Sequence, residues 1–219
     1  MSTYDFSYLR ECPEVDEVTV EIVGLEWDMF STVDNRGGKA NCQENPREFG
    51  EMRAAQLYGW TPELKNAWRM DLLQASVEDR NLMSEKYARM MESSFPEEYA
   101  RIEHLLPKLS SQQKEGIERL VEIVVGWAEE TARDYPAIAG AGRPLHTSED
   151  KPWATSIETY ARGEYSTWSL HTINCAVKCY ELALENDINL QQKADYFVAR
   201  MRGYNSLEEA EEAAAGRQA

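Results

Sequence analysis

Apolar residues recur at helical spacing along nearly the whole chain. The pattern is clearest in residues 14–33, where steps of three and four connect Val15, Val18, Ile22, Leu25, Met29 and Val33. This spacing places them on one face of a helix, and the alternation typical of a strand is absent from the segment. The sequence therefore predicts an all-α fold, an irregular bundle of about eight helices in a single domain.

Proline and capping residues indicate where the helices begin. Asn45-Pro46 and Thr61-Pro62 each combine an N-cap side chain with proline at the first helical position. Residues 135–153 are rich in proline and glycine and have no period, which predicts the longest loop. We expect one domain over residues 1–219, with an N-terminal arm at 1–13, helices over about 14–33, 46–58, 62–75, 81–94, 96–107, 111–128, 155–185 and 189–201, and an acidic C-terminal helix or tail at 206–219.

The chain is strongly acidic. Its 219 residues include 39 Asp and Glu against 23 Lys and Arg, which gives a formal net charge of −16. A uniform negative field repels nucleic acids and anionic membranes, so contact with RNA requires a local basic patch. No segment is apolar enough to span a membrane and no secretory signal is present, so we expect a cytoplasmic protein without membrane contact. The four cysteines form no CxxC pair, which favours free thiols.

Common cofactor and metal motifs are absent from the sequence. There is no GxGxxG, GxxxxGK[ST], HExxH or GxSxG, and the chain has three histidines in all. Nucleotide-binding folds, zinc proteases and α/β-hydrolases therefore lose support, and we expect neither a metal nor a cofactor.

Glu26 is the first candidate functional residue. It lies between Ile22 and Phe30 at i, i+4 spacing, close to the face that the apolar pattern would bury. Charged side chains are seldom buried without a partner, so Glu26 requires a cation. It either forms a surface salt bridge at the edge of the apolar stripe or faces a substrate.

The helix expected over 81–94 carries further ionisable residues. Glu85, Arg89 and Glu92 share one face, either as a solvated ladder of ion pairs or as part of a site. Lys86 is flanked by tyrosine and methionine, and desolvation would lower its pKa toward a catalytic range.

Residues 155–169 contain the densest group of polar side chains. Glu158 and Arg162 are i, i+4 partners, although Thr155 and Glu158 also fit a capping box. Gly163 lies between Arg162 and Glu164, and a glycine inside a helix suggests close approach by another backbone or a ligand. The hydroxyl of Ser166 is a candidate nucleophile with a stronger structural alternative.

The loop over residues 35–43 resembles an anion cradle, although it is equally consistent with a tight turn that ends a helix. Cys42 is the thiol most suited to chemistry, because Arg36 and Lys39 would favour its thiolate. Together with Arg47 and Arg53, these two cations form the most basic stretch of the chain, where a polyphosphate would dock.

Six fragments distributed along the chain resemble one bacterial and fungal family of helical proteins of unknown function. They are E-W-x-M-F, N-x-G-G-K-A-x-C-Q, M-R-x-x-Q, E-K-Y-A-R-M-M-E, E-T-Y-x-R-G-E-x-S-T and G-Y-x-S-L-E-x-A-E. Fungal members of this family resemble arginine-containing cyclodipeptide synthases. The resemblance implies an aminoacyltransferase of fungal natural-product biosynthesis that takes arginine from arginyl-tRNA and a second amino acid from another aminoacyl-tRNA, and joins them into a 2,5-diketopiperazine.

The resemblance also suggests roles for the candidate residues. Glu26, Glu92 or Glu158 would hold the arginine side chain, with Asn35, Arg53 and Ser166 as further substrate contacts, and Glu85 or Glu164 would transfer protons. Lys86, Arg89, Tyr160 and Arg162 could polarise the carbonyl. Arg36, Lys39 and Arg47 would contact tRNA. The sequence leaves open whether an aminoacyl-enzyme forms on Cys42 or Ser166, or the second amine attacks the tRNA ester directly.

Two other classes of function use the same residues. A cofactor-free enzyme acting on a free cationic amino acid or amine would need the carboxylates but no tRNA. A non-catalytic helical protein would use the acidic surface to bind a basic partner. The second amino acid and the oligomeric state do not follow from the sequence.

Overall fold

The predicted all-α fold is confirmed by a computed structural model, which describes residues 2–34, 38 and 41–218. No strand occurs among these residues, and eleven α-helices form one domain where about eight were expected. The helices are α1 (Glu17–Phe30), α2 (Pro46–Tyr58), α3 (Pro62–Val77), α4 (Leu82–Ser94), α5 (Pro96–Ile102), α6 (Ser111–Asp134), α7 (Pro136–Gly140), α8 (Ile157–Tyr165), α9 (Leu170–Glu185), α10 (Leu190–Met201) and α11 (Leu207–Gln218). Short 3-10 turns lie at Ser7–Glu11, Asn41–Glu44, Glu103–Leu105 and Thr147–Glu149.

The predicted continuous helix over 155–185 is wrong. The chain leaves the helix after Tyr165 and starts α9 at Leu170, because the side chain of Ser169 accepts a hydrogen bond from the Thr172 amide at 3.2 Å. The predicted loop over 135–153 is wrong at its start, where Pro136 begins the short helix α7. Residues 141–156 form the long connection to α8 and contain one 3-10 turn, Thr147–Glu149. Both differences raise the helix count above the expected number.

Most predicted helix starts are confirmed. The Asn45 side chain accepts from the Glu48 amide at 3.2 Å, and the Thr61 hydroxyl accepts from the Leu64 amide at 3.3 Å. The next long helix, α6, begins with a full capping box between Ser110 and Gln113. These local bonds fix where each helix begins before any tertiary contact is considered.

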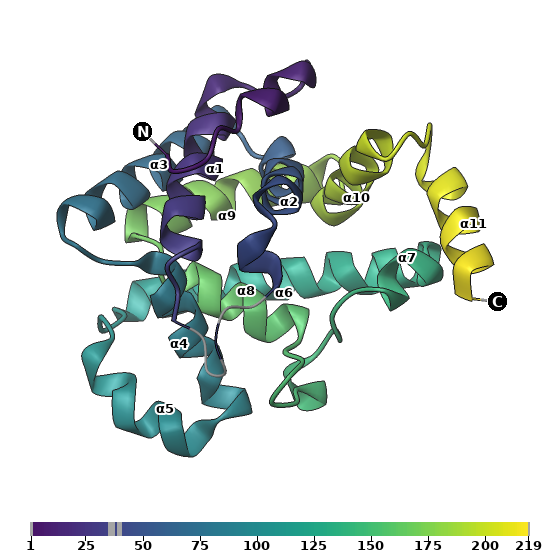
Figure 1. Cartoon of the computed structure of the whole chain (residues 1–219). Coiled ribbons are helices and arrows are strands. Elements are labelled where there is room, and N and C mark those ends of the chain that lie inside the picture. Colours follow the sequence, from purple (N-terminus) through teal and green to yellow (C-terminus); the bar gives the residue numbers. More distant parts are fainter. Residues whose placement is uncertain (1, 35–37, 39–40, 219) are drawn as a thin grey trace.

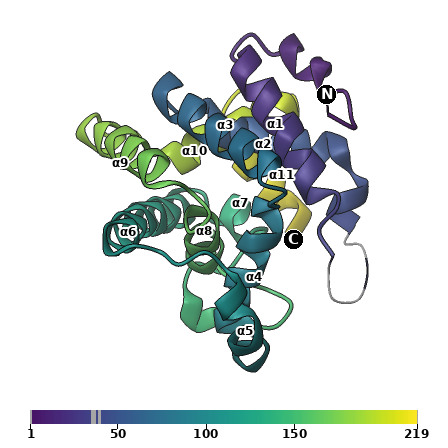
Figure 2. The ribbon, with the colours of Figure 1, turned by 90° about the vertical axis from the view of Figure 1, so that its left-hand side faces the viewer.

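The helices form two groups that share one hydrophobic core. Helices α2 and α3 both pack on α1, with α9 against α3 and α10 against α2, while α4 and α6 both pack on α8 (Figures 1 and 2). Contacts of α1 with α4, and of α6 with α9 and α10, join the two groups. The shared core is made of buried aliphatic and aromatic side chains, among them Ile22, Leu57, Trp68, Leu120, Trp168 and Ile173.

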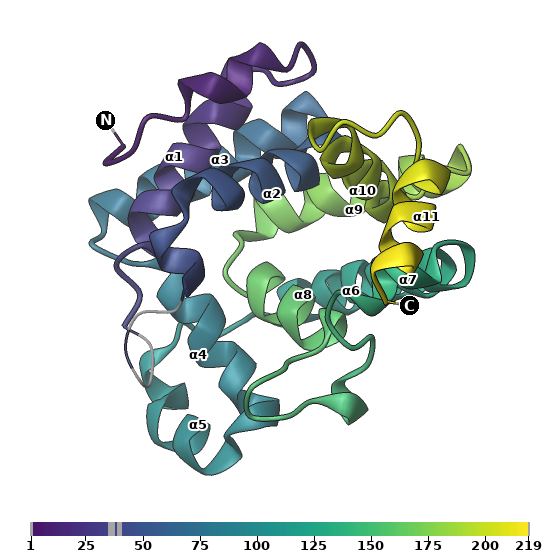
Figure 3. The ribbon, with the colours of Figure 1, turned by 45° about the vertical axis from the view of Figure 1, so that its right-hand side comes forward.

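Both ends of the chain pack on the domain. The N-terminal segment buries Phe6 and Leu9, and the acidic C-terminal segment forms α11, which lies against α7 (Figure 3). Glu211 of α11 accepts hydrogen bonds from the backbone amides of Ala137 and Ile138, at 2.6 and 2.8 Å. Acidic residues of the tail therefore have a structural use.

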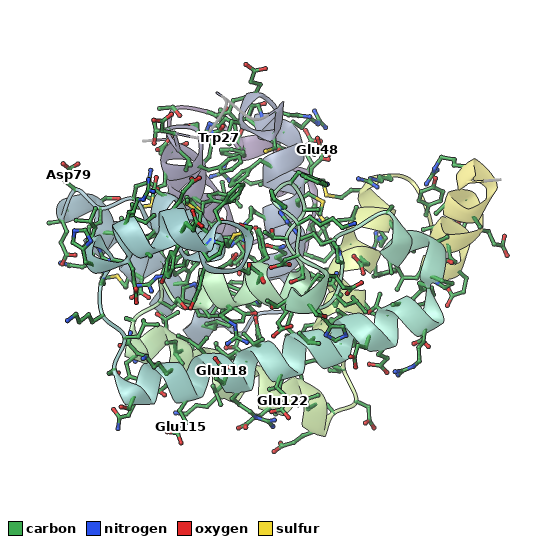
Figure 4. The ribbon with its side chains drawn as sticks, turned by 90° about the horizontal axis from the view of Figure 1, so that it is seen from below. Trp27, Glu48, Asp79, Glu115, Glu118 and Glu122 are labelled. Carbon is green, nitrogen blue, oxygen red and sulfur yellow. The ribbon has the colours of Figure 1, made fainter. Side chains whose placement is uncertain are left out.

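Part of the acidic excess lies on exposed helix faces. Glu115, Glu118 and Glu122 follow one another along α6 and are exposed (Figure 4), and Glu118 pairs with Arg162 of α8. Such spacing is typical of a solvated helix face. These residues add to the net charge without entering the interior.

Gly163 allows α8 to approach α4 closely, as its position inside a helix predicts. A Cβ atom at this position would lie 2.7 Å from Cγ of Met90 and 3.1 Å from the carbonyl oxygen of Lys86. The second of these atoms belongs to the backbone and cannot turn aside. The contact between α4 and α8 therefore requires a residue without a side chain.

Gly163→Ala should lower the free energy of unfolding by about 1–3 kcal/mol, because the added methyl group must push the two helices apart. Urea denaturation measures this change. Gly126→Ala is the matched control, since Gly126 lies on the exposed side of α6 with no atom near the added Cβ. That variant should gain up to about 1 kcal/mol from helix propensity. Equal stability of the two variants would contradict close packing at Gly163.

Candidate active site

Four charged side chains from four helices meet in the interior. Glu26 of α1, Arg53 of α2, Lys86 of α4 and Glu164 of α8 have exposed fractions of 0%, 6%, 2% and 6%. Charged groups are rarely buried to this degree unless each has a partner of opposite sign. The four form a chain of alternating charge in the order Glu26, Arg53, Glu164, Lys86.

The guanidinium of Arg53 binds the carboxylate of Glu26 in a fork. Its Nε donates to Oε2 at 2.6 Å and its Nη2 donates to Oε1 at 2.5 Å. The indole Nε1 of Trp68 donates to the same Oε1 at 2.7 Å, and Arg53 also donates to Gln56. Two-point pairing of this kind fixes both side chains in position. Glu26 is therefore fully buried, and the surface-edge interpretation of this residue is wrong.

Glu164 joins the two cations of the cluster. Its Oε2 lies 2.5 Å from Nζ of Lys86, and its Oε1 lies 3.3 Å from both Nη atoms of Arg53. Burial alone would raise the pKa of Glu164, but the two neighbouring cations outweigh it and lower the pKa to about 2. Glu164 is therefore a carboxylate at every physiological pH and a weak base.

Lys86 remains protonated. Burial lowers its pKa, but the electrostatic attraction of the Glu164 carboxylate and, after it, of Tyr160 is larger in sum. The pKa of Lys86 is therefore raised above its ordinary value. The expectation that desolvation would bring this lysine toward a catalytic base is therefore wrong. The pKa of Arg53 is likewise raised, because the attraction of Glu164 and Glu26 exceeds the effect of burial.

Tyr160 of α8 lies against two cations. Nζ of Lys86 is 3.5 Å from the ring centroid, and Cζ of Arg143 is 4.6 Å from it. Arg143 is itself held in place, because its Nη1 donates to the carbonyl and the hydroxyl oxygen of Thr155 at 3.0 and 2.9 Å. Contacts of this kind are attractive and orient the ring.

A cavity of about 700 Å³ opens beside the charge cluster. Side chains from α2, α4, α6, α8, α10 and α11 line it, and Figure 3 shows α2 and α10 on one side and α8 and α7 on the other. This volume lies within the range of small-molecule sites. Arg53, Lys86 and Glu164 reach the cavity wall, whereas Glu26 is not among the lining residues.

The sign of charge in the cavity is opposite to that of the chain. Among the described residues, five cationic side chains line it, Arg53, Lys86, Arg143, Arg202 and Arg217, against three carboxylates, Glu48, Glu164 and Asp195. The cavity thus combines cations with a few carboxylates, although the net charge of the chain is −16.

Several tyrosine side chains line the same cavity. Burial raises the pKa of Tyr87 to about 12, and it raises the pKa of Tyr165 and Tyr180, whose hydroxyl oxygens lie 3.2 Å apart. These phenols stay protonated near neutral pH and can donate hydrogen bonds to a substrate.

Asp195 of α10 is the third cavity carboxylate. Both of its oxygens accept from Nε2 of Gln191 at 3.1 Å. Burial raises its pKa, and the hydrogen bond from Gln191 offsets this only in part. No cation contacts Asp195 in the described part of the chain.

The structure brings together five of the residues singled out in the sequence, namely Glu26, Arg53, Lys86, Tyr160 and Glu164. Cys42 also lines the cavity and is exposed. Arg53 is buried, so the inclusion of Arg53 in a basic surface stretch is wrong.

The predicted ladder on α4 does not face the cavity. Glu85 pairs with Arg80 at 2.8 Å, and Arg89 donates to the Pro107 carbonyl at 2.7 Å. Glu92 is exposed on the same helix. None of the three predicted residues is among those that line the cavity.

The remaining candidates on α8 also point elsewhere. Glu158 pairs with Arg162 at 3.2 Å, as its spacing predicts, and accepts from the Thr147 amide at 2.9 Å. The N-cap of α8 is Ser156, so the capping box of Thr155 with Glu158 is wrong. Ser166 is buried at the end of the helix, outside the cavity lining.

Two of the three predicted tRNA contacts, Arg36 and Lys39, lie outside the residues that the structure describes, as does the predicted substrate contact Asn35. Arg47 is exposed on α2, where its Nε lies 3.1 Å from Oε1 of Glu51 and its guanidinium packs on the ring of Tyr8.

Sequence reasoning missed several cavity residues. Arg143 lies in a segment without periodicity, and Tyr165 and Tyr180 look like ordinary core aromatics. Asp195 had a weak signal, because Gln191 and Asp195 are i, i+4 neighbours beside the apolar positions Leu190 and Ala194. A carboxylate at the edge of an apolar stripe was recognised at Glu26, and the same reasoning applies to Asp195.

Comparison with known proteins identifies the family. The model of a family described as a protein of unknown function, DUF4125, matches residues 16–212, so the chain belongs to this family. This confirms the predicted membership in a helical family of unknown function. No curated protein and no solved structure matches the chain. Among the described residues, no helix is long and apolar enough to cross a membrane.

Glu164→Gln should destabilise the protein near neutral pH by about 3–5 kcal/mol, because it leaves Lys86 without its charged partner in the interior. The folded pKa of Glu164 is about 2, below its ordinary 4.5, so its stabilising effect is present above pH 4.5 and is lost as pH falls toward 2. Urea denaturation at several pH values should therefore show the two proteins converging at low pH.

Glu78→Gln provides the control for this series. Glu78 forms an exposed pair with Arg80 at 3.2 Å and should have little effect on stability. A difference between wild type and Glu164→Gln that is independent of pH would contradict the assigned charge state of Glu164.

Proposed function

We propose that this member of the DUF4125 family is an enzyme that forms an arginine-containing cyclodipeptide from aminoacyl-tRNAs, and that the 700 Å³ cavity is its active site. The observation that carries the proposal is the donor-rich cavity wall. The motif resemblance of the sequence supplies the reaction, and the chemistry of the wall supports it.

The reaction requires stabilisation of negative charge on a carbonyl oxygen. The α-amine of one aminoacyl group attacks the ester carbonyl of the other, which forms an amide and releases the tRNA hydroxyl, and a second attack closes the ring. Each attack passes through a tetrahedral oxyanion, which hydrogen-bond donors held in a dry cavity stabilise. Arg143, Tyr87 and Tyr160 are donors in this cavity.

The buried charges serve this wall indirectly. All the nitrogens of Arg53 bond to Glu26, Gln56 or Glu164, so its guanidinium is committed to the protein. Lys86, held by Glu164, packs on the ring of Tyr160 and positions it. We therefore assign the four-charge cluster to positioning and the hydroxyl of Tyr160 to contact with the substrate.

Proton transfer by Glu85 or Glu164 is not part of this proposal. Glu164 has a pKa of about 2, and Glu85 is paired with Arg80 and does not line the cavity. A base of this kind is dispensable, because a free α-amino group has a pKa of about 7.7–8.0 and is partly neutral near physiological pH. The leaving hydroxyl takes its proton from the attacking amine or from a tyrosine hydroxyl.

The cavity charges suit the aminoacylated end of tRNA. Cations such as Arg143, Arg202 and Arg217 can bind phosphate, and Asp195 can bind a positively charged group. The net charge of −16 opposes extensive contact with the tRNA body, so recognition would be confined to the end that enters the cavity.

A second candidate function is an enzyme that acts on a free cationic amino acid or amine. The observation that favours it is the same net charge of −16, which disfavours any nucleic acid. The same cavity would bind this substrate.

The purified protein, supplied with an aminoacylation extract and labelled arginine, should form a cyclic arginine dipeptide detectable by mass spectrometry. Treatment with RNase should abolish the product, because the ester bond to tRNA activates each amino acid. A product that survives RNase would support the free-substrate enzyme. Absence of any product with each of the other amino acids as partner would contradict both and favour a non-catalytic protein.

Cys42→Ser separates the two routes to the product. Loss of activity and of a trapped aminoacyl-enzyme would indicate transfer through the Cys42 thiol, which lines the cavity. Full activity would indicate direct attack of the second amine on the tRNA ester.

Tyr160→Phe should lower the turnover number by about a hundredfold with little change in KM, because it removes a donor that acts mainly in the transition state. Tyr99→Phe is the control, since Tyr99 lies on α5 and does not line the cavity. Unchanged turnover in Tyr160→Phe would remove this hydroxyl from the mechanism.

A further inference from the structure

Asp195 differs from the other carboxylates of the cavity. Glu164 is held by two cations, and Glu48 is exposed and accepts from Asn45 at 2.8 Å. The Asp195 side chain is half-buried, and its partner is the neutral amide of Gln191. In the part of the chain that the structure describes, it is the one half-buried cavity carboxylate without a cation.

Neighbouring cations of α10 do not reach this carboxylate. Arg200 pairs with Glu14 at 3.2 Å, and Nζ of Lys193 packs on the ring of Tyr58 at 5.4 Å. Arg202 is seven residues further along the helix, about 10 Å away along its axis. The fold therefore leaves Asp195 without charge compensation from its own helix.

A desolvated carboxylate without a partner cation is unfavourable, and a cation that enters the cavity removes this penalty. Asp195 and Gln191 supply three acceptor atoms, the two oxygens of Asp195 and Oε1 of Gln191, since Nε2 of Gln191 is already used as a donor. A planar guanidinium, with five N–H donors, matches such a set of acceptors.

We propose that Asp195, oriented by Gln191, binds the guanidinium group of the substrate and sets the specificity of the cavity for a cationic side chain. This inference rests on the proposed function, because it takes the cavity as the active site. Asp195 takes the guanidinium-binding role that the resemblance suggested for Glu26, Glu92 or Glu158. Glu26 already binds Arg53, and Glu92 and Glu158 lie outside the cavity lining. Substrate recognition and carbonyl activation are thereby assigned to different walls, α10 for the first and α8 with the Arg143 segment for the second.

Isothermal calorimetry with three ligands tests the inference on the intact protein. Agmatine and arginine carry a guanidinium group. Citrulline is isosteric with arginine but carries a neutral ureido group instead. Wild type should bind agmatine and arginine, with citrulline weaker by about tenfold or more. Asp195→Asn should weaken agmatine and arginine by a similar factor and leave citrulline unchanged.

Asp134→Asn is the matched control. Asp134 also accepts from a glutamine of α10, Gln192 at 3.0 Å, but it is exposed and does not line the cavity. Its variant should bind all three ligands as wild type does. A thermal melt without ligand adds a second readout, because Asp195→Asn removes a half-buried, unpaired charge and should melt at the same temperature or higher.

Two results would overturn the inference: wild type that fails to bind agmatine, or Asp195→Asn that binds agmatine as tightly as wild type. The measurement needs neither tRNA nor turnover. If the protein forms no cyclodipeptide but binds agmatine through Asp195, the proposed reaction fails while the guanidinium site stands.

Discussion

The alternating chain of charges from Glu26 through Arg53 and Glu164 to Lys86 is the interaction on which the centre of the molecule depends. Burial of each charge is costly, and the cost is offset only because every one of them has an opposite charge at hydrogen-bonding distance. The four come from α1, α2, α4 and α8, so the cluster determines how these helices sit against one another. Gly163 completes this arrangement by allowing α8 to approach the backbone of Lys86.

This internal pairing determines what remains for a substrate. Glu26 and Glu164 already bind cations of the protein, so in the proposed mechanism they act through the groups that they position. Lys86 presents the ring of Tyr160, and Arg143 packs on the same ring. Asp195, whose charge the protein leaves uncompensated, is the carboxylate still available to a cationic ligand.

Local signals predicted the helices well, and tertiary contacts explain the exceptions. The caps at Asn45, Thr61 and Ser110 are visible in the sequence because each involves residues three positions apart. The break before α9 was missed because an N-cap serine inside a helical pattern, Ser169, looks like an ordinary polar residue. At the site, the apolar neighbours of Glu26 and the glycine before Glu164 indicate both residues in the sequence. The pairing of Glu26 with Arg53 could not be predicted, because it depends on how α1 packs against α2.

The net charge of −16 has two physical parts. On α6, Glu115, Glu118 and Glu122 are exposed, so water and salt screen them and their number has little consequence for the interior. Among the described residues that line the cavity, five cations outnumber three carboxylates. Arg53, Lys86 and Glu164 are the buried ones, and low exposure to water makes their charges more effective. The average charge of the chain therefore describes its surface. The cavity has the opposite balance, and a ligand that carries both an anionic and a cationic group fits that balance better than a uniformly charged one.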